Sequence, residues 1–255
     1  MTTSTPRVTV ITGSAQGIGR RTAELCALRG DALALLDLRS SPIPNGADAL
    51  MLTGDLSDEG VVLAHKAAIL ERWGRVDALV NNAGISFITP AELTTAAAFR
   101  RVLDVNLTAP FLLCRELGQV MLTQRRGAVV NISSVAGLLA VSDRAAYNAS
   151  KHGLIGLTRT LAAEWGARGV RVNAVCPGWV KTEMDAADMG SGAYTDADIE
   201  GRVPMGRFAT PDDIARAVLY LTDEAASPFV NGVTLSVDGG WASDASWESL
   251  RVSKR

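Results

Sequence analysis

Tyr147 and Lys151 stand four residues apart in a stretch with helical patterning. Residues at that spacing share one face of a helix and lie within about 6 Å of each other. A phenol with a pKa of about 10 is a poor base at neutral pH, but a neighbouring ammonium favours the phenolate. Ser134, thirteen residues before Tyr147, can donate a hydrogen bond to a substrate oxygen. These residues together indicate proton transfer at an oxygen, although a Tyr-x-x-x-Lys pair alone is usually accidental.

A glycine-rich segment lies between the first predicted strand and the first predicted helix. Residues 12–19 read Thr-Gly-Ser-Ala-Gln-Gly-Ile-Gly, a G-x-x-x-G-x-G spacing. Glycines there let the backbone approach a pyrophosphate, whose charge rests on free N–H groups of the following helix. A plain strand–helix turn is the alternative, but the position after the first strand of an alternating pattern favours dinucleotide binding. The residues assigned to this contact are Gly13, Gln16, Gly17, Ile18 and Gly19.

Asp37 ends the second predicted strand, eighteen residues beyond Gly19. A carboxylate there accepts hydrogen bonds from an adenosine ribose and repels a 2′-phosphate. Arg39 argues the other way, since a guanidinium can pair with that phosphate. Gln16 and Ser14 add no positive charge to the loop. We therefore expect NAD rather than NADP.

These residues must be positioned by an α/β framework. Short apolar runs alternate with longer helical segments, which predicts a parallel sheet covered by helices on both faces. Right-handed crossovers then give a single doubly wound, Rossmann-type domain of about seven strands. The predicted strands are Arg7–Thr12, Ala32–Asp37, Ala49–Leu52, Val76–Val80, Ala128–Ile132, Val170–Val175 and Val233–Val237. The predicted helices are Gly17–Arg29, one capped by Ser57 and ending at Trp73, Thr95–Thr123, Arg144–Trp165 and one that begins at Pro211.

The composition fits one soluble domain over residues 1–255. The chain has 25 Lys and Arg against 27 Asp and Glu, a net charge of −2, so it lacks the basic field that nucleic-acid binding requires. There is no run of about 18 apolar residues for a membrane span, and the N-terminus lacks the regions of a signal peptide. Three cysteines without CxxC spacing fit a reducing compartment. We expect a cytoplasmic protein without a metal, since no His/Cys/Asp cluster has ligand spacing.

Two segments are longer than the connections that the predicted sheet needs. Residues 177–204 form a long stretch of irregular pattern, which is typical of a lid or substrate loop. A tail of about residues 241–255 carries Trp241, Trp247 and terminal basic residues. We hypothesise that this tail reaches the site of a neighbouring subunit.

Taken in chain order, the motifs resemble those of the short-chain dehydrogenase/reductase family, in its NAD(P)-dependent, Tyr-x-x-x-Lys form. The resemblance covers about residues 6–242, and several independent motifs agree in order and spacing. The motifs are the glycine segment 12–19, Asn-Asn-Ala-Gly at 81–84, Asn106, Ser134, the Tyr147 and Lys151 pair, and Pro-Gly at 177–178 followed by Thr182.

The resemblance implies a role for each of four catalytic residues. Tyr147 would be the general acid/base at the substrate oxygen, and Lys151 would lower its pKa and hold the nicotinamide ribose. Ser134 would orient the carbonyl or alcohol. Asn106 would anchor a water chain that carries the proton from Lys151 to solvent. The cofactor then supplies the hydride chemistry.

The resemblance also implies further cofactor contacts. Asp55 would reach the adenine amine, while Val180 and Thr182 would fix the carboxamide. The remaining contacts of this kind are Leu56, Asn82, Ala83, Gly84, Pro177 and Gly178, together with Tyr147 and Lys151.

The walls expected to face the substrate mix small apolar surface with a few polar groups. This suits a small polyol, sugar or hydroxy/oxo acid better than a wholly apolar steroid. Arg144 would recognise a carboxylate, although an exposed arginine at a helix start is the commoner situation. The candidates are Ser86, Ser134, Val141, Arg144, Trp179 and Met184.

We expect an oxidoreductase that transfers a hydride between NAD(H) and a secondary alcohol or ketone. An NADPH-dependent 3-oxoacyl-carrier-protein reductase is the alternative enzyme, and Asp37 argues against it. A non-catalytic NAD(P)-binding regulator is the alternative of another class, and it would predict loss of the catalytic set. The resemblance implies a homotetramer, in which the apolar residues Leu154, Leu157, Leu161 and Trp165 either meet another subunit or are buried within their own domain.

Overall fold

The computed structural model describes residues 6–183, 195–247 and 250–251. Within these residues, a seven-stranded parallel sheet has the order β3-β2-β1-β4-β5-β6-β7. This sheet confirms the predicted doubly wound architecture. The strands are β1 (Val8–Thr12), β2 (Ala32–Asp37), β3 (Ala49–Thr53), β4 (Ala78–Asn81), β5 (Gly127–Ile132), β6 (Val170–Pro177) and β7 (Thr234–Val237).

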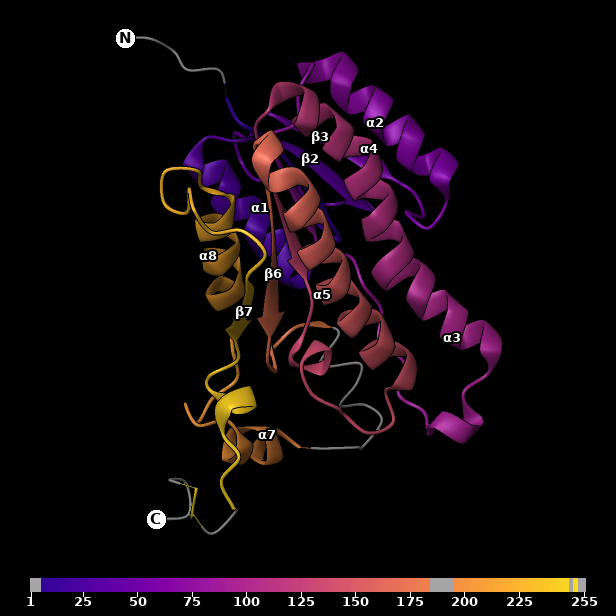
Figure 1. Ribbon diagram of the computed structural model, residues 1–255, viewed down its shortest axis with the longest axis vertical. Helices are drawn as coiled ribbons and strands as arrows, with labels where there is room; N and C mark the ends of the chain where they lie inside the picture. The colour runs from indigo at the N-terminus through magenta and orange to yellow at the C-terminus, as the bar shows by residue number, and fades with distance from the viewer. Residues whose placement is uncertain (1–5, 184–194, 248–249, 252–255) are drawn as a thin grey trace.

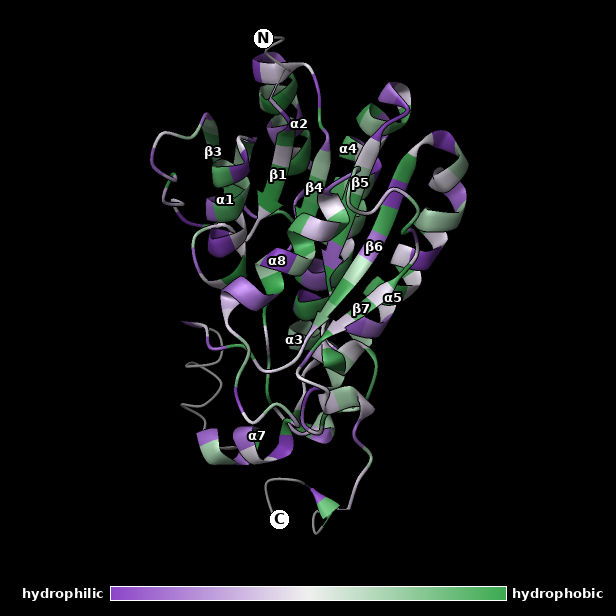
Figure 2. Cartoon of the chain, turned by 90° about the vertical axis from the view of Figure 1, so that its left-hand side faces the viewer, coloured by the Kyte–Doolittle hydropathy of each residue, from purple (hydrophilic) through white to green (hydrophobic). Residues whose placement is uncertain are grey.

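The central strands are buried on both faces. Every residue of β1 and β4 is buried, whereas the edge strand β3 has none in that class. Figure 2 shows the hydrophobic colouring of these inner strands between the helices. Strands that are apolar on both sides need cover on both sides, which explains the α-helices that follow most of the strands.

Helices form a layer on each face of the sheet (Figure 1). The first layer holds α1 and α8, which pack against each other and enclose a core that includes Leu35 and Ile214. The second holds α2, α4 and α5 over a core that includes Leu113 and Met121. The helix bounds are α1 (Gly17–Arg29), α2 (Glu59–Trp73), α3 (Ala96–Leu103), α4 (Ala109–Gln124), α5 (Ala145–Trp165), α7 (Asp196–Arg202) and α8 (Pro211–Thr222).

The helix predicted over 95–123 is interrupted. A π-helical turn, Asp104–Thr108, separates α3 from α4. Pro110 lies four residues after Asn106, so it has no N–H for the Asn106 carbonyl and its ring crowds that carbonyl. The wider turn relieves this conflict. The turn contains Asn106, which is buried.

The predicted cap of α2 was wrong by one residue. Asp58, not Ser57, is the N-cap, and its carboxylate accepts a hydrogen bond from the Gly60 N–H at 2.7 Å. The Ser57 hydroxyl instead donates to Asp55 at 2.7 Å. A carboxylate at the positive end of a helix gains from the helix dipole, which favours aspartate here.

The predicted loop 177–204 is not wholly irregular. Residues 196–202 form α7, which begins with a capping box between Thr195 and Asp198. The Thr195 N–H donates to the Asp198 carboxylate at 2.8 Å. The substrate candidate Met184 lies outside the described residues. Short 3-10 turns in the described residues include Ala91–Leu93 (η1), Val135–Gly137 (η3) and Trp241–Ser243 (η5).

The apolar stripe of α5 is explained by the chain's own core. Leu154, Leu161 and Trp165 are each at most 7% exposed, and Leu157 packs on the same core. This stripe therefore gives no support to an interface between subunits.

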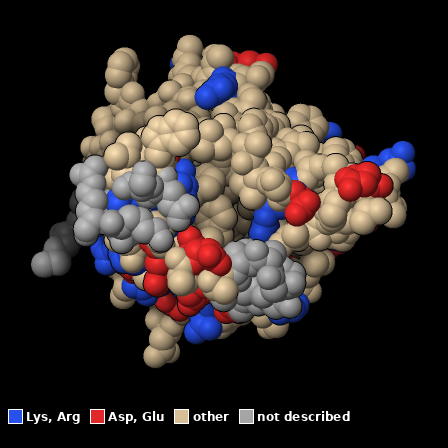
Figure 3. Space-filling model, turned by 90° about the horizontal axis from the view of Figure 1, so that it is seen from below, with Lys and Arg blue, Asp and Glu red and all other residues tan. Residues whose placement is uncertain are grey.

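Figure 3 shows the lower face, where the described Lys and Arg side chains form no continuous basic surface. Within the ranges that the structure describes, no helix has the length and apolar character to cross a membrane.

Candidate active site

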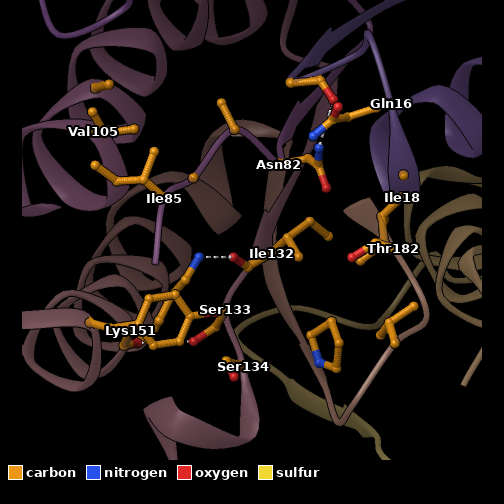
Figure 4. Close-up of a pocket in the computed structure, with 18 of the residues that line it drawn as sticks. Gln16, Ile18, Asn82, Ile85, Val105, Ile132, Ser133, Ser134, Lys151 and Thr182 are labelled. Carbon is orange, nitrogen blue, oxygen red and sulfur yellow. Dashed lines mark hydrogen bonds between the residues drawn. The ribbon is translucent and has the colours of Figure 1, made fainter. Parts of the chain in front are cut away.

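A cavity of about 500 Å³ lies at the carboxyl ends of the strands, near the point where the strand order reverses between β1 and β4. Ligands of open α/β sheets bind at that point. The cavity brings together the predicted residues Gly13, Gln16, Gly17, Ile18, Asp37, Asp55, Leu56, Asn82, Ala83, Gly84, Ser134, Val141, Arg144, Tyr147, Lys151, Pro177, Gly178, Trp179, Val180 and Thr182. Figure 4 shows part of this set, with Gln16 and Asn82 at one end and Ser134 and Lys151 at the other.

The glycine segment has the geometry of a pyrophosphate cradle. Gly13 and Gly17 have φ values of +63° and +54°, a region that side chains other than glycine rarely adopt. A Cβ at Gly19 would lie 2.1 Å from the Gly13 carbonyl oxygen. Gly19 thus lies behind the loop rather than among the cavity-lining residues, where it lets α1 approach β1. The free N–H groups at the start of α1 then face the space that a dinucleotide phosphate would occupy.

Asn82 ties the glycine segment to β4. Its Nδ2 donates to the carbonyl oxygens of Thr12 and Gly13 at 3.0 and 3.1 Å. The Thr12 hydroxyl accepts from the backbone N–H groups of Asn82 and Ala83, both at 2.9 Å. The loop is therefore held in its open shape before any ligand binds.

Asp37 is fixed at the end of β2. Its two carboxylate oxygens accept from the backbone N–H groups of Ala15 and Arg39, each at 3.0 Å. The guanidinium of Arg39, the residue that argued for NADP, donates to the Gln16 side-chain oxygen at 2.6 Å. The carboxylate of Asp37 and the guanidinium of Arg39 therefore lie at the same end of the cavity.

Sequence reasoning missed Arg101. Its guanidinium pairs with Asp55 at 2.8 Å and donates to the Ser57 hydroxyl at 2.8 Å. Burial alone would raise the pKa of Asp55, but hydrogen bonds from Ser57 and Arg101 outweigh it and lower that pKa. Arg101 belongs to α3 and also lines the cavity. No local sequence signal connects it to Asp55, because the pair forms only when α3 packs near the end of β3.

Lys151 is 4% exposed and lies on α5 with its Nζ pointing to the end of β5. The Nζ donates to the Ile132 carbonyl oxygen at 2.9 Å, the dashed line in Figure 4. It lies 5.5 Å from the centre of the Tyr147 ring. Burial lowers the pKa of Lys151 from 10.5 to about 8. The helix spacing thus places a buried amine beside the phenol, as the sequence predicted.

The two adjacent serines have different surroundings. Ser133 is buried, and its hydroxyl donates to the Lys151 carbonyl oxygen at 2.9 Å, which anchors α5 to β5. Ser134 is less buried and is the N-cap of η3, where its Oγ accepts from the Ala136 N–H at 3.1 Å. That bond uses Ser134 as an acceptor, so its O–H proton is available for a substrate oxygen.

Asn106 does not line the cavity directly. Its Oδ1 accepts from the Ile85 N–H at 2.9 Å, and its Nδ2 donates to the Ile85 carbonyl at 2.9 Å and to the Ser150 hydroxyl at 3.1 Å. A Cβ at Gly84 would lie 3.3 Å from the Asn106 Oδ1 and 3.6 Å from the Lys151 Nζ. Asn106 and Lys151 therefore flank Gly84, and glycine keeps the space between them open.

Arg144 precedes α5 and lines the cavity near Tyr147. Its Nη1 donates to the Ser86 hydroxyl at 2.6 Å, and its Cζ lies 6.0 Å from the centre of the Tyr147 ring. A parallel bridge between Thr89 and Arg144 holds the backbone there. Ser86 thus supports Arg144 rather than forming part of the cavity lining itself.

The two histidines have structural surroundings. His65 is 7% exposed, with its Nε2 3.3 Å from the Thr53 carbonyl oxygen, and burial lowers its pKa. His152 is exposed, with its Nδ1 2.9 Å from the Asn148 carbonyl oxygen. Among the described residues, no group of three or more His, Cys, Asp and Glu could hold a metal ion.

Comparison with known proteins matches most of the chain. A family model described as enoyl-(acyl carrier protein) reductase matches residues 13–242. The short-chain type dehydrogenase/reductase y4vI of Sinorhizobium fredii is 43% identical over 93% of this chain and 44% of that protein, so the chain spans less than half of that relative. The D-threitol dehydrogenase of Mycolicibacterium smegmatis is 39% identical over 92% of each protein.

Solved structures share the fold at similar identity. The structure of levodione reductase has a TM-score of 0.89 and 34% identity, covering 93% of this chain and 98% of that one. A structure from Beutenbergia cavernae, described as an NAD(P)-dependent gluconate 5-dehydrogenase, has a TM-score of 0.86 and 37% identity, covering 93% and 97%. Together with the family model, these matches show that the chain belongs to the short-chain dehydrogenase/reductase family.

Proposed function

We propose that the protein transfers a hydride between NAD(H) and a secondary alcohol or ketone, with Tyr147 as the general acid/base. The observation that carries this proposal is one continuous cavity with the glycine cradle at one end and Tyr147, Lys151 and Ser134 at the other. Its relatives and neighbours include a D-threitol dehydrogenase and a levodione reductase, names that fit this reaction class.

The residues at the two ends of the cavity fit a dinucleotide. Gly13, Gly17 and the start of α1 would hold the pyrophosphate, and Asp37 would bind the adenosine ribose. Val180 and Thr182 also line the cavity, and they would hold the carboxamide. When bound, the nicotinamide supplies the hydride acceptor or donor.

Tyr147 would exchange a proton with the substrate oxygen. In the oxidation direction the phenolate accepts the hydroxyl proton, and in reduction the phenol donates it to the developing alkoxide. The Lys151 ammonium favours the phenolate by electrostatic attraction, since opposite charges nearby stabilise the charged form. Ser134 would donate its hydroxyl proton to the same oxygen and fix its orientation.

Asn106 would support proton exchange with solvent. Its side chain holds the Ile85 backbone and, across the open space at Gly84, lies near Lys151. We assign to this space the water chain that carries the proton between Lys151 and solvent. The chain has all four residues of the proposed catalytic set, Asn106, Ser134, Tyr147 and Lys151. Their presence argues against a non-catalytic regulator.

The preference for NAD within the proposal depends on Asp37. Its carboxylate is held in place by two backbone N–H groups and would repel a 2′-phosphate. The Beutenbergia cavernae structure holds NADP at low occupancy, so direct comparison of the two cofactors is the necessary test. We expect kcat/KM for NAD to exceed that for NADP at least tenfold, and equal values would contradict the role of Asp37.

We propose a small polyol, sugar or hydroxy/oxo acid as the substrate. The names of two similar proteins refer to threitol and gluconate, and Arg144 places a guanidinium beside Tyr147. The test is a panel of polyols, aldoses and hydroxy acids, followed by NADH absorbance. Activity with a 3-oxoacyl carrier protein, and with no member of the panel, would favour the alternative enzyme instead.

The family also suggests a cytoplasmic homotetramer, which remains our proposal. Sedimentation analysis of the purified protein tests the assembly. A monomer at micromolar concentration would contradict it.

A further inference from the structure

The segment after β7 packs against a wall of the cavity. Trp179, which lines the cavity, follows the Pro-Gly turn at the end of β6. Its ring centre lies 4.9 Å from that of Trp241, with the two planes tilted by 57°. Both indoles pack on a small cluster formed by Ile199, Val203 and Phe208. Tilted aromatic pairs at this distance are favourable beyond their burial, so Trp241 restricts how the Trp179 ring can lie.

The backbone on either side of this pair is closely fitted. The Gly178 N–H donates to the Val237 carbonyl oxygen at 3.1 Å, and a Cβ at Gly178 would lie 2.9 Å from the Asp238 Cα. Asp238 is 8% exposed, and its carboxylate accepts from the N–H groups of Gly240 and Ala242, both at 2.9 Å. The turn that leads to Trp241 therefore has a defined position relative to Trp179.

The segment after β7, from Gly239 to Asp244, also contacts α7 and the residues just beyond it. The Arg202 Cζ lies 5.1 Å from the Trp241 ring centre, and its Nη2 donates to the Asp244 carbonyl oxygen at 2.8 Å. The Asp244 carboxylate pairs with Arg202 at 3.3 Å. The Met205 N–H, just beyond α7, donates to the Gly239 carbonyl oxygen at 3.2 Å. Figure 1 shows the yellow turn at 241–243 beside α7.

We propose that Trp241 is a positioning residue for substrate binding: it fixes Trp179 as an apolar wall for the carbon skeleton of the substrate. The inference rests on the proposed function, because it needs a substrate beside Tyr147. It also changes the hypothesis about the tail, since Trp241 contacts the site of its own chain. Trp247, by contrast, is 80% exposed, and Lys254 and Arg255 lie outside the described residues.

The contact between Trp179 and Trp241 makes a specific kinetic prediction. Without Trp241, the Trp179 ring has more orientations, and the substrate must select one of them when it binds. That cost falls on substrate binding and leaves the hydride and proton steps intact once the substrate is bound. The expected signature is a higher KM for substrate with kcat and cofactor affinity retained.

The experiment compares Trp241→Ala and Trp241→Phe with the matched control Trp247→Ala, using the best substrate of the panel. We expect Trp241→Ala to raise the substrate KM about tenfold, while kcat and the NADH dissociation constant stay within about threefold. Trp241→Phe keeps an aromatic partner and should restore most of the affinity. Trp247→Ala should behave as wild type.

Two results would overturn the proposal. One is an unchanged KM in Trp241→Ala. The other is a parallel loss of kcat, NADH affinity and thermal stability, which indicates general loosening. If Trp241→Ala does not fold, Asp244→Asn weakens the contact between the same segment and α7 while both indoles remain. This variant should raise the substrate KM by a smaller factor. An unchanged substrate KM in Asp244→Asn would contradict the proposal. The proposed function and this inference would both be overturned if the wild-type protein were inactive on the whole panel with both cofactors. If the wild type is active and Trp241→Ala has an unchanged substrate KM, only the inference is refuted.

Discussion

Replacing Lys151 by methionine should make the ligand-free protein more stable at neutral pH. Lys151 is buried, and burial lowers its pKa from 10.5 to about 8. At about 1.4 kcal/mol for each tenfold change in proton affinity, keeping the ammonium buried costs about 3 kcal/mol of folding free energy. The variant loses the hydrogen bond from the ammonium to the Ile132 carbonyl oxygen, and a bond from a charged group is worth about 2 kcal/mol. The net gain is about 1 kcal/mol.

The pH dependence follows from the direction of the shift. Below pH 8 the amine is protonated in both states, so wild type carries the full cost. Between pH 8 and 10.5 the folded state loses its proton while the unfolded state keeps it, so wild type becomes more stable relative to the variant as pH rises. Above 10.5 the cost is gone and only the hydrogen bond remains. The two stability curves should therefore cross between pH 8 and 10.5.

The assay is urea unfolding of the ligand-free protein from pH 6 to 10.5, with wild type and Lys151→Met at the same protein concentration. A thermal scan at pH 7 should show the melting temperature of the variant about 2–4 °C higher, from the usual relation between free energy and melting temperature for a chain of this size. The variant should have lost turnover, a cost in activity for a gain in stability. A variant that is less stable at pH 7, or a difference that does not change with pH, would refute the reasoning.

Four further predictions concern the proposed site. Tyr147→Phe should lower kcat by about 10²–10⁴-fold and leave the NADH dissociation constant unchanged by fluorescence titration, and turnover within a few-fold of wild type would exclude Tyr147 as the acid/base. Gly19→Ala should weaken NADH binding at least tenfold, because the new Cβ would lie 2.1 Å from a backbone oxygen; normal affinity would contradict the close packing of the cradle. Asp37→Ser should raise kcat/KM for NADP at least tenfold by removing charge repulsion, which parallel assays with both cofactors measure. Arg144→Gln should raise the KM for a hydroxy acid over tenfold and that for a neutral polyol less than threefold, and equal effects on both would argue against a carboxylate contact.

Local patterns in the sequence determined the strands, the helices and much of the site. The four-residue spacing of Tyr147 and Lys151 is a property of any helix, so their shared face was predictable. The glycine segment was predictable for the same reason, since positive φ angles and close approach require glycine wherever the chain makes that turn. Alternating apolar strands and helices likewise determined the doubly wound sheet.

Only the tertiary structure decided which distant side chains meet. Arg101 reaches Asp55, and Trp241 reaches Trp179, through contacts between segments far apart in the sequence. The π-helical turn at Asn106 depends on both local sequence and tertiary packing. Pro110 disturbs the helix locally, but the contact of Asn106 with Ile85 depends on how the two segments pack. Periodicity predicts the face on which a residue lies but not its partner, because the partner depends on how whole elements pack. For this reason the sequence predicted the chemistry of the site and Trp179 as a candidate, whereas the contact of Trp179 with Trp241 became visible only in the folded chain.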